Sequence, residues 1–69
     1  MPEEPAFHPR LNATHAENRI AFLQFLAAQG RESDMVNFII EVRKVTDGRL
    51  RRHRWIDVAR RYAKLEWIP

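Results

Sequence analysis

The apolar residues that follow Thr14 recur at helical spacing and predict a first helix. Thr14 and Glu17 form a capping box, in which the hydroxyl and the carboxylate each satisfy a backbone N–H at the helix start. The helix is expected to run through Gln29 and to stop at Gly30, because glycine readily adopts the left-handed conformation that ends many helices.

This first helix carries two apolar stripes. The first stripe consists of Ala16, Ile20, Leu23 and Ala27, and the second of Phe22, Phe25 and Leu26. A helix packed on one side needs only one stripe a little over about 100° wide. The helix therefore offers more apolar surface than a single contact can cover.

A second helix is predicted from Asp34 to about Val45, with Ser33 as its N-cap. Asp34 falls in the first turn, where the helix dipole favours an acidic side chain. Val36 and Ile40 lie outside the main apolar face of this helix. That face consists of Met35, Phe38, Ile39, Val42 and Val45.

A strand is the alternative for this segment. From Val36 to Arg43 apolar and polar residues also alternate, and many of the apolar ones are β-branched. Thr46 to Gly48 would then form a hairpin turn, but residues 49–54 lack the alternation that a partner strand needs. Helical periodicity and length favour the helix.

A third helix is predicted from near Leu50 to about Trp67. Its apolar residues follow the spacing of an ordinary amphipathic helix. The predicted face consists of Trp55, Val58, Ala59, Tyr62 and Leu65.

Residues 1–13 are expected to form an extended arm, because Pro2, Pro5 and Pro9 disfavour helix there. The arm is either disordered or bound in a groove of a partner through Phe7. The predicted architecture is therefore all-α: a small three-helix unit at residues 14–69, forming a single helical domain, with an extended proline-containing N-terminal arm.

The size of the chain raises the question of what stabilises it. A single core in 69 residues supplies only about 3–5 kcal/mol unless a disulfide, a metal or a partner chain adds to it. The chain has no cysteine, and its three histidines, His8, His15 and His53, do not have the i, i+4 spacing of a shared metal site. No metal and no cofactor are predicted, which leaves association with another chain, either a second copy or a larger complex.

Charge is concentrated in the C-terminal part of the chain. Residues 42–69 hold nine basic and three acidic residues (+6), and residues 1–41 hold three basic and six acidic ones (−3). Such a field indicates an acidic partner. The nine basic residues are Arg43, Lys44, Arg49, Arg51, Arg52, Arg54, Arg60, Arg61 and Lys64.

Catalysis and membrane insertion are not expected. The only serine, Ser33, is accounted for as a helix cap, and there is no glycine-rich phosphate loop or evident nucleophile–base pair. Three short helices also offer little room for a substrate cavity, so no small-molecule substrate is predicted. No apolar run approaches the roughly 20 residues of a membrane span, and the N-terminus does not resemble a secretory signal, so a soluble, intracellular protein is expected.

Two segments resemble parts of known families. Phe25-Leu26 through Phe38-Ile-Ile-Glu-Val42 resembles the middle helices of regulators of G-protein signalling. Arg54-Trp55-Ile-Asp-Val58-Ala-Arg-Arg-Tyr62 is similar to the tryptophan-containing helix of AT-rich interaction domains, which bind DNA. Each resemblance covers less than half of such a domain, and the two imply different folds, so no site residue is transferred from either.

The sequence thus predicts a non-enzymatic protein-interaction module, such as an adaptor, an inhibitor or an accessory subunit. Its exposed apolar helix faces are expected to bind another protein, and its basic C-terminal helix to steer that partner. The predicted interface residues are Phe7, Phe22, Phe25, Leu26, Val36 and Ile40. The alternative is a small dimeric DNA- or RNA-binding regulator that contacts phosphates through the basic residues named above.

Overall fold

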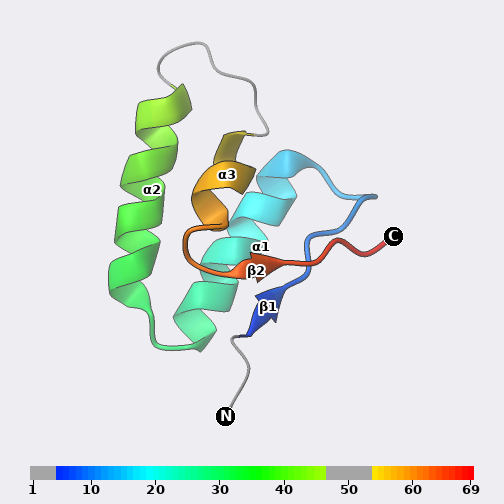
Figure 1. The fold of residues 1–69 in the computed structure, drawn as a ribbon, viewed down its shortest axis with the longest axis horizontal. Helices are drawn as coiled ribbons and strands as arrows, with labels where there is room; N and C mark the ends of the chain where they lie inside the picture. The colour runs from blue at the N-terminus through cyan, green and yellow to red at the C-terminus, as the bar shows by residue number, and fades with distance from the viewer. Residues whose placement is uncertain (1–4, 47–53) are drawn as a thin grey trace.

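The computed structural model describes residues 5–46 and 54–69, most of which are helical. Two long helices, α1 (His15–Ala28) and α2 (Glu32–Thr46), lie side by side, and the short α3 (Trp55–Ala59) packs against α2 (Figure 1). Two strands of two residues each, β1 (Ala6–Phe7) and β2 (Lys64–Leu65), form a small parallel sheet beside α1. The prediction of a mainly helical chain is therefore confirmed.

The two ends of α1 follow the sequence prediction closely. The N–H of Glu17 donates to Thr14 Oγ1 at 3.1 Å, and the N–H of Thr14 donates to Glu17 Oε1 at 3.2 Å, so the capping box is present. At the other end Gly30 has a φ of 70°, and the N–H of Arg31 donates to the carbonyl of Leu26 at 3.0 Å. This is the hydrogen-bond pattern of a Schellman motif, which glycine permits.

Residues 36–43, for which a helix and a strand were both considered, are helical, so the strand alternative is wrong. The proposed N-cap is also wrong, because α2 begins at Glu32 and Ser33 lies inside its first turn. The turn after α1 is so short that Arg31 already accepts the first helical hydrogen bond, from Met35 N–H at 3.1 Å. The Arg31 side chain pairs with Asp34 at 2.7 Å across this first turn.

The long third helix predicted to reach Trp67 is wrong. The α3 helix ends at Ala59, and β2 follows after a turn at residues 60–63. The N–H of Glu66 donates to the carbonyl of Phe7 at 2.9 Å, a bond that a helix through this segment would not allow. Pairing with the arm overrides the helical periodicity of the sequence, and the predicted helix start at residues 50–53 lies outside the described residues.

The N-terminal arm is extended at β1, as predicted, but it belongs to the fold of its own chain. Ala6 pairs with Lys64 and Phe7 with Leu65 in parallel register. The side chain of Asn18 then holds the arm to α1, because its oxygen accepts from the N–H of Arg10 and its amide donates to the carbonyl of Arg10, both at 3.0 Å. The prediction that Phe7 anchors the arm in a partner's groove is therefore wrong, because Phe7 is buried in the core of its own chain.

The core lies where the arm, α1, α2 and α3 meet, and it is rich in aromatic rings. The centroid of the Phe22 ring lies 4.9 Å from that of Phe38 and 5.1 Å from that of Phe7. Trp55 is fully buried, and its indole N–H donates to Nδ1 of His15 at 3.2 Å, so its polar group is satisfied. The buried core cluster consists of Phe7, Phe22, Leu26, Phe38, Trp55, Val58, Ala59 and Ala63.

Candidate functional site

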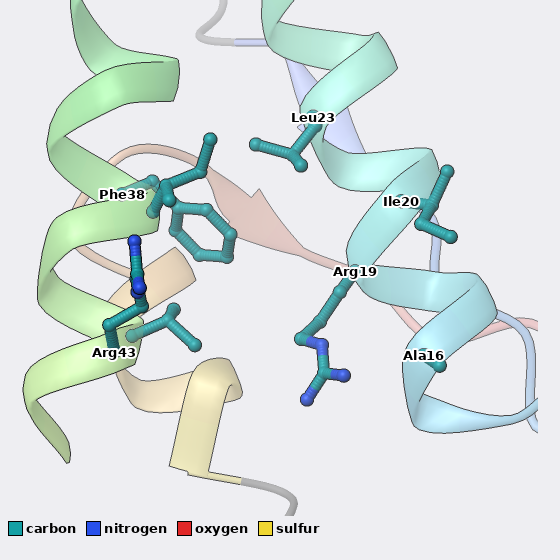
Figure 2. A pocket seen from close by; sticks show the side chains of 8 residues that line it. Ala16, Arg19, Ile20, Leu23, Phe38 and Arg43 are labelled. Atoms are coloured by element: carbon teal, nitrogen blue, oxygen red, sulfur yellow. The ribbon is translucent and has the colours of Figure 1, made fainter. Parts of the chain in front are cut away.

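A groove runs between α1 and α2 on the side that the arm does not cover (Figure 2). Its volume is about 470 Å³, and Leu23 and Phe38 point toward each other across it from the two helices. Its apolar lining consists of Ala16, Ile20, Leu23, Phe38, Ile39 and Val42. Residues early in α1 share this lining with residues late in α2, so the two helices are antiparallel.

Exposed apolar side chains extend the groove on both helices. The exposed fractions are 57% for Ile20, 55% for Val36, 47% for Ile40 and 40% for Ile39, and Leu23 is half-buried. Positions three and four apart lie on one helix face, which places Val36, Ile39 and Ile40 together on α2 and Ile20 and Leu23 together on α1. We call these five residues the α1–α2 apolar face.

The groove has a basic end. Arg19 and Arg43 complete its lining where α1 begins and α2 ends, and Figure 2 shows Arg19 reaching into the space between the helices. At the other end of α2, the first-turn residue Glu32 is an exposed acid. The face is therefore apolar in its middle and charged with opposite signs toward its two ends.

The titratable residues Glu41, Arg61 and Tyr62 form a hydrogen-bonded cluster that stabilises the fold. The Tyr62 hydroxyl donates to Glu41 Oε1 at 3.0 Å, and the Arg61 guanidinium donates to Glu41 Oε2 at 3.0 Å. Burial and the bond to Glu41 raise the pKa of the Tyr62 hydroxyl, so it remains a neutral donor. The cluster fastens the turn after α3 to α2. Within residues 5–46 and 54–69, no three His, Asp or Glu side chains converge on a point that would hold a metal ion.

The predicted interface residues separate into two groups. Phe7, Phe22 and Leu26 are buried in the core of this chain, so the prediction that they bind a partner is wrong at these three positions. Phe25 is half-buried and packs on Phe7, with ring centroids 5.4 Å apart, so it also belongs mainly to the core.

Val36 and Ile40 are exposed, as the prediction of surplus apolar surface on the second helix requires. The prediction from the sequence assigned the wrong stripe of α1 to the surface. The fold buries the phenylalanine-rich second stripe and exposes most of the first, which includes Ile20.

The described members of the predicted basic surface do not form one array. Arg54 and Arg60 both pair with Asp57, at 3.0 and 3.7 Å, and Arg61 pairs with Glu41 at 3.0 Å. Three others are exposed at separate places in the chain, two in the last turn of α2 and one in β2: Arg43, Lys44 and Lys64. Arg49, Arg51 and Arg52 lie outside the described residues.

Sequence reasoning missed several members of the candidate site. Ile20, Leu23 and Ile39 were not among the predicted interface residues, and Arg19 was not singled out. Their helical phase was visible in the sequence, because Ile20 follows Ala16 at i+4 and Arg43 follows Ile39 at i+4. What the sequence did not show was which side of α1 the arm would cover.

Comparison with protein-family models, with curated proteins and with solved structures gave no match. In the described part of the chain, no helix has the length and apolar character needed to cross a membrane. The groove and the α1–α2 apolar face are therefore the features from which a function can be inferred.

Proposed function

We propose that this chain is a non-enzymatic protein-interaction module that docks another protein chain on the α1–α2 apolar face. The observation that supports this most strongly is the continuity of the face: exposed branched side chains from two adjacent helices flank one apolar groove. Apolar surface exposed to water forgoes about 25 cal/mol per Å², and contiguous apolar patches of this kind mark interaction sites. An adaptor, an inhibitor or an accessory subunit uses such a surface.

The charged ends of the face add orientation to this docking. Arg19 and Arg43 stand at one end of the groove, so a partner with a carboxylate at the matching position binds in one direction. Charge at the rim of an interface acts mostly on association rate and register. The apolar middle of the face supplies most of the affinity.

The test compares two aspartate substitutions in quantitative affinity purification from extracts of the cells that make the protein. Ile20→Asp places a charge in the face, whereas Leu11→Asp places one on another exposed apolar residue, which lies outside the face. Binding partners are expected to be retained by the wild type and by Leu11→Asp and lost from Ile20→Asp, while circular dichroism shows unchanged helix content. Equal retention by all three proteins would contradict the proposal.

A nucleic-acid-binding function is the second candidate, and the exposed pair Arg43 and Lys44 in the last turn of α2 is the observation in its favour. It has less support than the first, because Arg54 and Arg60 already pair with Asp57, and Arg61 pairs with Glu41, which offsets part of their positive charge. Fluorescence anisotropy with duplex DNA and single-stranded RNA at two salt concentrations tests it. Phosphate contacts require an affinity that falls steeply with salt, and absence of binding near physiological salt would exclude this function.

A further inference from the structure

The outward row of α2 carries an acid, an apolar segment and a base in order. Glu32, Val36, Ile39 and Arg43 follow one another at spacings of four, three and four residues, which keeps them on one side of the helix. Arg43 is eleven positions after Glu32, a distance of about 16 Å along the helix axis. The row is therefore complementary to a copy of itself that runs in the opposite direction.

The residues that line the groove beside this row are complementary in charge to the same copy. A second α2 laid in the groove antiparallel to the first brings its Glu32 to the end where Arg19 and Arg43 stand. Its Val36 and Ile40 then lie over the apolar lining that Ile39 helps to form. The parallel orientation would place its Arg43 against Arg19 and Arg43, where like charges repel.

We propose that the occupant of the groove is a second copy of this chain, bound with its α2 antiparallel to the first, so that Glu32 of each copy pairs with Arg19 and Arg43 of the other. The contact is two-fold symmetric, since the arrangement that places the first α2 in the second groove also places the second α2 in the first. The four long helices then form one bundle with a shared apolar centre. Association of this kind stabilises a chain whose own core is small. This inference rests on the proposed function, because it names the partner of the same face.

Charge reversal in two separate chains tests the direction of packing. The first chain carries Glu32→Arg and the second carries Arg19→Glu with Arg43→Glu. Each chain alone repels its own copy at both ends of the groove, so its dimer dissociation constant is expected to rise at least tenfold over the wild type. An equimolar mixture restores attraction at both ends and is expected to form a heterodimer. Analytical ultracentrifugation over a concentration series measures the dissociation constants of the wild type, of each reversed chain and of their mixture.

A control and a second measurement separate charge effects from misfolding. Asn37→Arg adds a positive charge on α2 nearly half a turn from Ile39, and it is expected to leave the dissociation constant unchanged. The chain contains no cysteine, so Val36→Cys in one copy and Ile39→Cys in the other provide a crosslink without charge reversal. The antiparallel register places these two positions opposite each other, and the mixed disulfide is expected to form faster than either homodimeric one.

A wild type that stays monomeric up to millimolar concentration would overturn the second copy as occupant. The proposed function would then be decided separately by the partners that Ile20→Asp loses. A dimeric wild type whose reversed chains fail to associate when mixed, or whose mixed disulfide forms no faster than the homodimeric ones, would overturn the antiparallel arrangement.

Discussion

Replacing Phe7 with alanine is the sharpest test of the fold, because the sequence alone placed this residue in a detached arm. The side chain is 6% exposed, and its ring lies 5.1 Å from that of Phe22 and 5.4 Å from that of Phe25, measured between centroids. Truncation of a buried phenylalanine to alanine costs about 3–5 kcal/mol. The single core of so small a chain supplies about the same amount, so Phe7→Ala is expected to abolish most of the folded population.

The assay is urea unfolding followed by circular dichroism, with all proteins at one fixed concentration because self-association would add to the apparent stability. Leu11→Ala is the matched control. Leu11 lies four residues further along the same arm and is 67% exposed, so its truncation is expected to change the free energy of unfolding by less than about 0.5 kcal/mol. A loss below about 1 kcal/mol for Phe7→Ala would refute the conclusion that the arm forms part of the core.

Three further substitutions test local features of the fold. Asn18→Ala removes both hydrogen bonds to the backbone of Arg10 and is expected to lower the free energy of unfolding by about 1–3 kcal/mol, seen as a lower midpoint of thermal unfolding. An unchanged midpoint would contradict the role of Asn18 in holding the arm to α1. Gly30→Ala meets no atom within 4 Å, so only the positive φ opposes it, and a loss of about 1–2 kcal/mol in urea unfolding is expected; a much larger loss would reveal a contact that the structure lacks. The raised pKa of Tyr62 means that folding favours the protonated hydroxyl, so its contribution to stability is complete below about pH 10 and declines as the pH rises through the folded-state pKa. Tyr62→Phe is expected to remove this part of the alkaline decline in unfolding free energy, and a decline identical to that of the wild type would contradict the assignment.

The local features of this fold were predictable because neighbouring residues determine them. The capping box at Thr14 and the stop at Gly30 each involve residues within five positions of one another, and both were located correctly. The start of α2 was misplaced by two residues, since Ser33 is an excellent cap in isolation but the turn from Gly30 is too short to leave it outside the helix. A cap prediction depends on where the preceding helix stops.

Pairing between distant segments was not predictable. The register of Phe7 with Leu65 joins residues 58 positions apart, and neither two-residue strand has enough alternation to identify it. The apolar spacing of Trp55, Val58 and Tyr62 looked like one long helix, although the chain leaves the helix after Ala59. Periodicity shows which residues share a face while a helix lasts, but it does not show where a competing backbone partner ends the helix.

Because the sequence did not reveal that the arm pairs with β2, the candidate site was placed on the wrong side of the first helix. The prediction considered only three helices and found more apolar surface than they could bury. Exposed isoleucines and a valine are indeed present. The arm, however, fills one side of α1, because Phe7 packs on Phe22 and Phe25 and so converts their stripe into core. The surplus therefore moves to the opposite side of the helix, where Ile20 and Leu23 face the groove. Removal of the arm is accordingly expected to destroy the core, whereas substitutions at Ile20 act on association and leave the fold intact.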